Sequence, residues 1–311
     1  MRRFLKKILV LCLLMLAAAI VLDAAFTSIF REGRTVKAQW LRSIQGQHFD
    51  VVVTGSSRAW WNIDVNAIAR ACDLRAISLA NNHFTPSEVL LSLKLFLANG
   101  NTVDRILYEV NYQSLSVEQD EFSSTVYDHL PWLEDTIVYG HLAYRSNEWI
   151  WLRHVPFARY ARYNFRWGAE EALVTLLDER NTLFDSTGSF FIDRDYRGYP
   201  YYEVRPTTFR LNDDIRRTIR LCEERGIQLV LFMAPYYRLR MFEGGEEQLR
   251  NMLNEEGLVM HDFSMRLDST IHFDNNYHLS LRGGRLFTDM LINELVCPEQ
   301  MSKNMPASPV Q

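Results

Sequence analysis

The longest apolar pattern in the chain lies at its start. Ile8 to Leu22 carry no charge, and the apolar run resumes after Asp23 as Ala24 to Phe30. This length suffices for a hydrocarbon core, which takes roughly 20 helical residues, if Asp23 lies near the outer edge of the span. The preceding basic residues should stay cytoplasmic by the positive-inside rule: Arg2, Arg3, Lys6 and Lys7. The pattern predicts a signal anchor over residues 1–30.

A cleaved signal peptide is the alternative for the same segment, because the uninterrupted run from Ile8 to Leu22 also suits the apolar part of a signal. The sequence Leu22-Asp23-Ala24-Ala25 puts bulky or charged side chains where a cleavage site needs small ones. This favours a single-pass anchor in the cytoplasmic membrane. In either case the rest of the chain lies on the periplasmic or extracellular side.

Beyond the anchor, apolar runs alternate with amphipathic segments. Val51-Val52-Val53 lies in a run from His48 to Gly55 that shows no polar alternation, as in a strand covered on both faces. Further strands are expected at Arg75 to Ala80, Arg105 to Val110, Gln228 to Ala234 and Leu258 to Phe263, and helices at Asp64 to Cys72, Pro86 to Ala98, Leu211 to Arg225 and Glu246 to Glu256. Such alternation predicts an α/β fold, a three-layer doubly wound parallel sheet.

The alternation stops between Ser116 and Arg205. This segment holds four of the seven Trp and nine of the fourteen Tyr, which predicts a helical, aromatic-rich insertion. Most of these rings should pack the insertion. The pairs Trp149/Trp151 and Tyr160/Tyr163, with Arg153, Arg159, Arg162 and Arg166 between and around them, can also form a wall over the sheet edge. Because the insertion follows the third strand, part of it should overhang the carboxyl edge.

The resulting division has four parts: an anchor over residues 1–30, a juxtamembrane linker or short helix over 31–48, an α/β domain over 49–297 with an insertion at 116–205, and a disordered tail over 298–311. The net charge of −4 and the isoelectric point near 6.1 argue against nucleic acid as a partner. Cys72, Cys222 and Cys297 show no metal-binding spacing; a Cys72–Cys222 disulfide is conceivable, but buried free thiols are favoured.

Two segments carry candidate chemistry. Gly55-Ser56-Ser57-Arg58 follows the first strand, so the Ser57 hydroxyl should lie at the carboxyl edge of the sheet, where nearby N–H groups can hold an anionic oxygen. Asp274 and His278 lie on one loop before an apolar helix, where a carboxylate can orient an imidazole toward a nucleophile. A turn or helix-capping role is the alternative for each residue taken alone.

Together these segments resemble the SGNH/GDSL hydrolase family, and within it the extracytoplasmic, membrane-anchored branch that includes the teichoic-acid D-alanyl transfer protein and the alginate O-acetyltransferases. Gly55-Ser56-Ser57 resembles its first sequence block, Ser78-Leu79-Ala80-Asn81-Asn82 its second, and Asp274 with His278 its last. The family commonly places its Asp three residues before the His, a position that Asn275 holds here. The resemblance covers about residues 49–111 and 228–295 and implies a flavodoxin-like sheet.

The resemblance also implies a mechanism without cofactor or metal. Ser57 is the expected nucleophile, His278 the base and Asp274 the residue that orients His278, while the N–H of Ala80 and the side chain of Asn111 hold the oxyanion. Asn81 or Asn82 can replace Asn111 in that role. The implied reaction is ester hydrolysis or O-acyl transfer on an acylated cell-envelope glycan or a small ester.

Two other classes of function stay open. A membrane-anchored binding or assembly protein can keep the same fold after losing turnover, and the altered Asp–His spacing favours it. A metal-dependent hydrolase that uses His272, Asp274 and His278 has suitable ligand atoms, but further ligands at a recognisable spacing are missing from the sequence.

Overall fold

The computed structural model describes residues 1–33, 36–115, 123–163, 170, 173–174, 176–177, 184–190, 209–239 and 241–298. The chain divides into two compact units. The helical unit comprises Met1–Ile44 and Ser124–Leu183, and the α/β unit comprises Gln45–Ser123 and Phe184–Gln311. The predicted insertion at 116–205 is therefore shared between the two units, and its larger part groups with the N-terminal helix.

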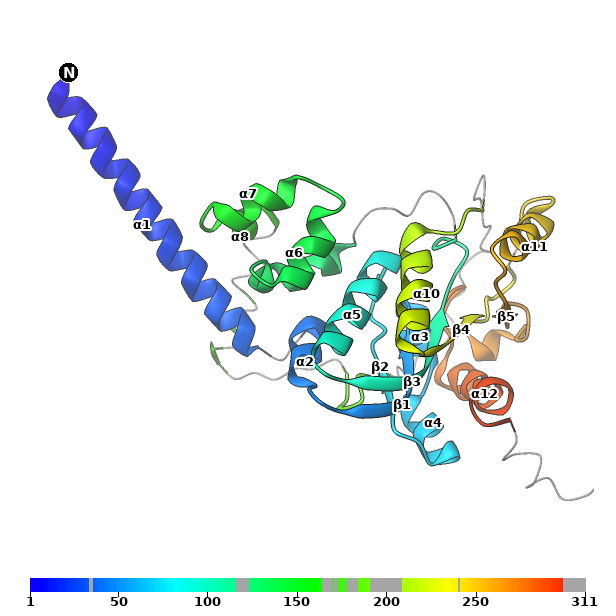
Figure 1. Ribbon diagram of the computed structural model, residues 1–311. Helices are drawn as coiled ribbons and strands as arrows, with labels where there is room; N and C mark the ends of the chain where they lie inside the picture. Colours follow the sequence, from blue (N-terminus) through cyan, green and yellow to red (C-terminus); the bar gives the residue numbers. More distant parts are fainter. Residues whose placement is uncertain are drawn as a thin grey trace, which may run out of the picture. The chain divides into compact units, whose positions relative to one another are not determined.

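The α/β unit is built on one sheet of five parallel strands in the order β2-β1-β3-β4-β5 (Figure 1). The strands are β1 (His48–Thr54), β2 (Ala76–Ser78), β3 (Thr102–Glu109), β4 (Gln228–Met233) and β5 (Met260–Asp262). Val52 of β1 pairs with Ile77 on one side and Ile106 on the other. All five strands were predicted from apolar runs, and the doubly wound parallel sheet is confirmed.

Helices cover both faces of this sheet. They are α3 (Ser57–Asn62), α4 (Val65–Cys72), α5 (Pro86–Ala98), α10 (Asp213–Arg225), α11 (Gly245–Glu255), η2 (Thr270–His272), α12 (Leu281–Leu291) and η3 (Ile292–Val296). Right-handed crossovers place the helices that precede β2 and β3 on opposite faces, because the two connections run in opposite directions along the sheet. Accordingly α5 contacts α10, while α12 contacts α3 and α4.

Local signals fix the ends of the predicted helices. Glu88 accepts a hydrogen bond from the Thr85 N–H at 2.9 Å and completes a capping box, with Pro86 at the first helical position of α5. Asn212 caps α10 at its start, and Gly226 ends it in the left-handed conformation with φ 66°. Of these residues, Pro86 and Gly226 are the ones from which the helix boundaries were predicted.

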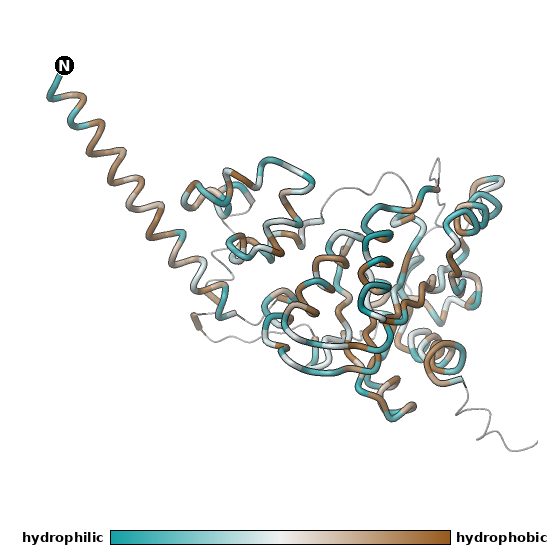
Figure 2. The backbone as a smooth tube through the Cα atoms, viewed as in Figure 1, coloured by the Kyte–Doolittle hydropathy of each residue, from teal (hydrophilic) through white to brown (hydrophobic). Residues whose placement is uncertain are grey.

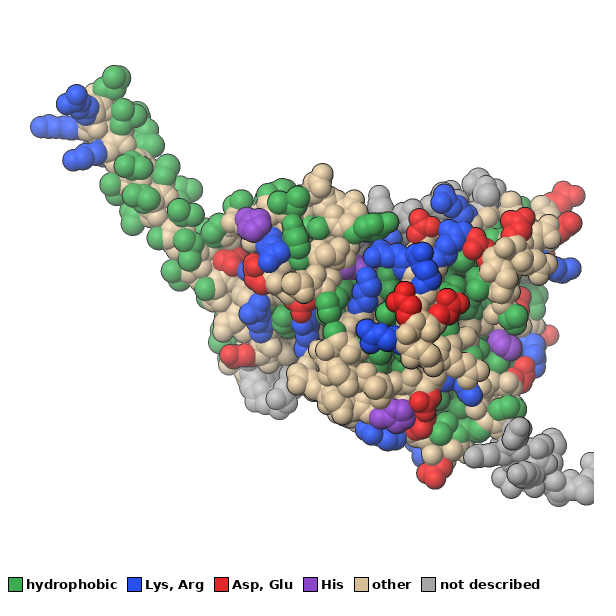
Figure 3. Space-filling model, viewed as in Figure 1, with side chains coloured by type: hydrophobic (Ala, Val, Ile, Leu, Met, Phe, Trp, Pro, Cys, Tyr) green, Lys and Arg blue, Asp and Glu red, His purple; other side chains and the backbone are tan. Residues whose placement is uncertain are grey.

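The helical unit begins with α1 (Arg2–Glu32), a single helix long and apolar enough to span a membrane. Figure 2 shows hydrophobic residues along most of its length, and Figure 3 shows basic side chains gathered at its free end. The other elements with described bounds are α2 (Lys37–Ser43), η1 (Ser124–Trp132), α6 (Thr136–Ala143), α7 (Glu148–His154) and α8 (Ala158–Tyr163). The predicted linker at 31–48 contains α2. The predicted tail, from residue 299 on, lies outside the described residues.

A disulfide bond joins Cys72 at the end of α4 to Cys297 just after η3. Cys222 is buried on α10 as a free thiol, and burial raises its pKa to about 12. The conceivable Cys72–Cys222 pair is therefore wrong, and so is the favoured assignment of Cys72 and Cys297 as free thiols. Proximity in the fold decides the pairing, because α4 contacts η3.

We expect loss of this disulfide to destabilise the α/β unit, because the bond closes a loop with a sequence separation of 225 residues. Cys297→Ser should lower the free energy of unfolding by about 2–4 kcal/mol. Urea unfolding of the full chain in detergent micelles, with and without dithiothreitol, measures the effect. Reductant should destabilise the wild type and leave the variant unchanged; a wild type insensitive to reductant would show that the bond contributes nothing.

Candidate functional site

The turn after β1 presents Ser56 and Ser57 at the carboxyl edge of the sheet. Gly55 enters this turn with φ 139°, and a Cβ at this position would lie 2.8 Å from the Cβ of Glu109. Ser56 caps α3 by accepting a hydrogen bond from the Arg58 N–H at 3.3 Å. Ser57 is the first residue of α3. The site lies beside the point where the strand order reverses between β1 and β3, the usual position of a ligand site in such sheets.

His278 lies on a tight loop between η2 and α12. Phe273 and Leu279 form an isolated antiparallel bridge, and the Asp274 N–H donates to the His278 carbonyl at 2.9 Å. The loop is also tied to α3, because the Leu279 N–H donates to Oδ1 of Asn62 at 2.9 Å. One short helix therefore starts with Ser57 and ends with a side chain that holds the histidine loop.

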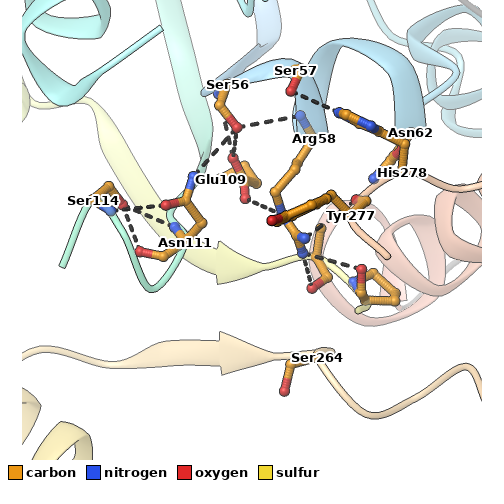
Figure 4. A network of polar contacts seen from close by, with 12 residues as sticks. Ser56, Ser57, Arg58, Asn62, Glu109, Asn111, Ser114, Ser264, Tyr277 and His278 are labelled. Atoms are coloured by element: carbon orange, nitrogen blue, oxygen red, sulfur yellow. Dashed lines mark hydrogen bonds and ion pairs between the residues drawn. The ribbon is translucent and has the colours of Figure 1, made fainter. Parts of the chain in front are cut away.

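The structure brings Ser57 and His278 together (Figure 4). Nε2 of His278 lies 2.8 Å from Oγ of Ser57, although the two residues are 221 positions apart in the sequence. The Trp61 ring packs beside the imidazole, with 4.4 Å between ring centroids. Both Ser57 and His278 are half-buried. The predicted convergence of these two side chains is confirmed.

The partner of the other imidazole nitrogen is Asn275, not the expected Asp274. Nδ2 of Asn275 lies 3.1 Å from Nδ1 of His278 and also donates to Oδ2 of Asp274 at 3.2 Å. The reason is local: Oδ1 of Asn275 accepts hydrogen bonds from the N–H groups of Tyr277 and His278 in an Asx turn. This turn folds the side chain at position 275 under the ring, while Asp274 is one residue too early to reach it.

This arrangement determines the tautomer of a neutral His278. The amide nitrogen of Asn275 can only donate, so Nδ1 of His278 must accept, and the ring carries its proton on Nε2. The Nε2–H then points at Ser57 Oγ. A base that removes the serine proton needs the opposite tautomer, which a carboxylate at position 275 would favour.

A buried ion pair supports the turn that carries Ser57. Nε of Arg58 donates to Oε1 of Glu109 at 3.1 Å, and the side chains of the pair are 4% and 0% exposed. Oε2 of Glu109 accepts from the Ser56 hydroxyl at 2.9 Å. Glu109 at the end of β3 thus fixes both the residue before Ser57 and the residue after it.

The rest of the Arg58 guanidinium reaches two further loops. Nη2 donates to the carbonyls of Ala234 and Pro235 just after β4, and Nη1 donates to the Tyr277 carbonyl at 3.3 Å. The Tyr236 ring lies 3.4 Å from the guanidinium carbon. Arg58 therefore connects β1, β3, the loop after β4 and the backbone immediately before His278.

The predicted oxyanion donors differ in access. Ala80 has no exposed surface, so a ligand cannot contact its N–H in this conformation. Asn111 follows β3 and is half-buried, with Nδ2 3.5 Å from the Ser56 hydroxyl and Oδ1 fixed by the Ser114 N–H (Figure 4). Asn81 is nearly buried and donates its N–H to the Gly55 carbonyl at 3.3 Å. Of these groups, the Asn111 amide is the better placed donor.

Part of the predicted insertion does lie beside this site. Phe190 stacks on Trp60 at 4.9 Å and lies 6.2 Å from Trp61, whose ring contacts His278. The Gly188 carbonyl accepts from Nε1 of Trp60 at 3.0 Å. Residues 184–190 therefore lie beside the site, and residues 191–208 lie outside the described part of the chain.

The predicted aromatic pairs belong to the helical unit. Trp149 is buried on α7, and Tyr160 on α8 stacks on Phe30 of α1 at 5.8 Å. Tyr160 therefore packs against the N-terminal helix, as expected for a ring that holds a subdomain together. Arg166 lies outside the described residues, and so does the side chain of Tyr163.

The metal-site alternative is not supported by the described residues. Among them, His48, Asp50 and Asp104 place three potential ligand atoms within 4.8 Å of one another. The described atoms of His272, Asp274 and His278 do not form such a cluster. That cluster lies near the starts of β1 and β3, at the edge of the sheet remote from Ser57.

Comparison with known proteins adds no identity: no family model matches the chain, and no curated protein matches it. The class of site therefore rests on its own geometry, a serine and a histidine in contact at the carboxyl edge of a parallel sheet.

Sequence reasoning missed Arg58, Glu109 and Asn62 as supporting residues. The available signal was their position, because Arg58 follows the serine pair directly and Glu109 is the last residue of an apolar strand. A charge in such a place is costly unless it is paired.

We expect rupture of the Arg58–Glu109 pair to be strongly destabilising. Glu109→Gln leaves the Arg58 charge buried without its counter-charge, which should cost about 3–5 kcal/mol of unfolding free energy. The matched control is Glu256→Gln at the partly exposed Arg216–Glu256 pair, where about 0–1 kcal/mol is expected. Thermal unfolding of the full chain in detergent, for the single variants Glu109→Gln and Arg58→Met and for the double variant, measures the coupling between the two side chains. Equal losses of stability in Glu109→Gln and Glu256→Gln would contradict a structural role for the buried pair.

Proposed function

We propose that the α/β unit is a serine-dependent acyl-transfer enzyme, an esterase or O-acyltransferase, with Ser57 as nucleophile and His278 as base. The observation that carries this proposal is the 2.8 Å contact between Ser57 Oγ and His278 Nε2 at the carboxyl edge of the sheet. Arg58 supports this contact, because it joins the turn that carries Ser57 to the end of β3, to the loop after β4 and to the loop that carries His278.

The reaction proceeds in two steps on these side chains. In the tautomer of His278 that carries its proton on Nδ1, Ser57 Oγ attacks the ester carbonyl carbon while its proton passes to Nε2 of His278, and the carbonyl oxygen becomes an oxyanion. The Asn111 amide donates a hydrogen bond to that oxygen, a contribution of about 3–4 kcal/mol for donors of this kind. His278 returns the proton to the leaving alkoxide, and water or a sugar hydroxyl then releases the acyl group from Ser57.

The resemblance of the Ser57 and His278 segments to SGNH/GDSL hydrolases supports the same proposal. The Trp61 and Phe190 rings beside His278 suit a sugar ring or an acyl chain, so an acylated cell-envelope glycan or a small ester is the substrate class. The chemistry of the site uses neither metal nor cofactor.

The proposed location is the outer side of the cytoplasmic membrane, with α1 as a single-pass anchor. The length and apolar character of α1, with basic residues at its start, support the anchor. The Cys72–Cys297 disulfide supports the outer side, because such bonds persist in oxidising compartments and are rare in the cytosol.

A second function is favoured by one specific observation. Asn275 donates to Nδ1 of His278 and so disfavours the tautomer that accepts the serine proton. In a serine protease, replacing the orienting carboxylate by an amide lowers kcat on the order of 10⁴-fold. A membrane-anchored binding or assembly protein, which uses the same pocket to hold an acylated glycan without turnover, fits this feature.

Covalent capture separates the two functions. A fluorophosphonate probe should modify Ser57 in the full-length protein, because the contact with His278 assists loss of the hydroxyl proton. Intact mass and peptide mapping should show one adduct, absent in Ser57→Ala. Ser56→Ala is the matched control one residue away and should keep the adduct. An unmodified wild type would favour the binding protein, and an adduct that survives Ser57→Ala would contradict Ser57 as the nucleophile.

A further inference from the structure

The elements η1 and α8 pack against one end of α1. Nη2 and Nε of Arg159 donate to the two carboxylate oxygens of Asp23 at 2.6 and 3.0 Å, and the Phe157 N–H donates to Asp23 Oδ1 at 3.0 Å. The Arg159 side chain is 6% exposed. A carboxylate inside an apolar helix is thus neutralised by a partner from the helical unit.

The next turns of α1 are covered by the same elements. The rings of Phe26 and Phe157 meet edge to face at 5.3 Å, and the Thr27 hydroxyl lies 2.7 Å from the Tyr160 hydroxyl. Nε of Arg31 donates to the Pro131 carbonyl at 3.0 Å. From Asp23 onward, α1 is therefore packed against protein along one side, whereas its large apolar residues from Phe4 to Leu22 are exposed.

The exposed apolar segment matches a bilayer in length. At 1.5 Å per residue, Phe4 to Leu22 extends about 28 Å, close to a hydrocarbon core of about 30 Å. The ammonium groups of Lys6 and Lys7 can reach the interface on their long side chains. If α1 spans the membrane as proposed above, Asp23 and the residues bound to it lie at the outer boundary of the hydrocarbon.

The part of the helical unit bound to Asp23 also exposes apolar side chains. Trp149 and Leu152 form the buried side of α7, but Ile150, Trp151 and, just after the helix, Val155 are 46, 43 and 49% exposed. A helix that faces water normally carries polar residues on its outer side. Val155 is two residues from Phe157, whose N–H binds Asp23, so one end of this apolar surface lies close to the residue at which the exposed apolar part of α1 ends.

Polar groups line an open cavity of about 580 Å³ at the same junction. Its lining carries both signs of charge, with Asp23, Glu32, Glu134, Arg31 and Arg159. Apolar side chains on α7 and a hollow with both signs of charge match in kind the acyl chains and the zwitterionic headgroups of a membrane interface. Trp is the side chain most typical of that depth, together with Tyr.

We propose that α7 and the turn to Phe157 rest on the outer leaflet of the membrane that α1 crosses, with Ile150, Trp151 and Val155 inserted at the boundary between headgroups and acyl chains. The Asp23–Arg159 pair sets the depth of this contact, because it joins the outer end of the span to α8. The helical unit is then a second membrane contact that fixes the tilt and rotation of α1. The inference rests on the proposed anchor and is independent of chemistry at Ser57.

Depth-dependent quenching tests this contact in the full-length protein. With Cys12 replaced by Ser, Val155→Cys carries an environment-sensitive nitrobenzoxadiazole label in nanodiscs of phosphatidylethanolamine and phosphatidylglycerol. Spin-labelled acyl chains should quench this label. Its emission should lie at a shorter wavelength than that of the same labelled protein unfolded in aqueous denaturant without detergent. The matched control is Val259→Cys, an exposed valine of the α/β unit, which should show neither effect.

The companion variant is Trp151→Glu, which places a charge at the proposed interface and should reduce quenching of the label at position 155. Unchanged quenching in that variant, or equal quenching at positions 155 and 259, would overturn the proposal. Absence of lipid quenching, with cross-linking of position 155 to another protein in native membranes, would assign the surface to a protein partner and also overturn it. Adding Ser57→Ala to the labelled Val155→Cys protein should leave the quenching unchanged. Failure of the membrane-contact proposal is therefore separable from failure of the enzymatic proposal.

Discussion

The ion pair between Arg58 and Glu109 is the interaction on which the candidate site depends. Glu109 ends β3 and binds the turn after β1, while Arg58 extends from that turn to the loop after β4 and to the backbone before His278. Two buried charges stabilise a fold only when their geometry and additional hydrogen bonds offset desolvation, and here both side chains have such bonds. The pair therefore holds Ser57 and His278 in one place, although they belong to distant parts of the sequence.

Within that frame, a single side chain decides how reactive the pair is. Asn275 has the right position and the right turn to orient His278, but it offers a donor where an orienting carboxylate would offer an acceptor. Asp274 binds Asn275 rather than the ring, and its other oxygen, Oδ1, is buried without a hydrogen-bond partner among the described residues. The same loop thus contains an amide and a carboxylate in adjacent positions, with the amide at the ring.

The sequence predicts the sheet well because parallel strands buried on both faces must be apolar runs, as Val51 to Val53 show, and because Pro86 and Gly226 mark helix ends chemically. Ser57 and His278 could be predicted because each lies in a segment at the sheet's edge. The choice of Asn275 over Asp274 depends on an Asx turn, and the Cys72–Cys297 bond on packing of α4 against η3, so neither has a signal in the pattern. Likewise, Phe26 and Phe30 continue an apolar run whose sequence predicts a membrane span. In the structure these two rings pack against Phe157 and Tyr160 instead.

The most direct test exchanges the two loop side chains in the double variant Asp274→Asn/Asn275→Asp, which keeps the net charge and puts the carboxylate beside His278 Nδ1. The measurement is the rate constant for acylation of Ser57 by p-nitrophenyl acetate, with the same double change in a Ser57→Ala background as control. If Ser57 and His278 form an acyl-transfer pair limited by the histidine tautomer, the rate should rise by up to about 10⁴-fold. A rate that stays the same or falls in a correctly folded variant would contradict the account.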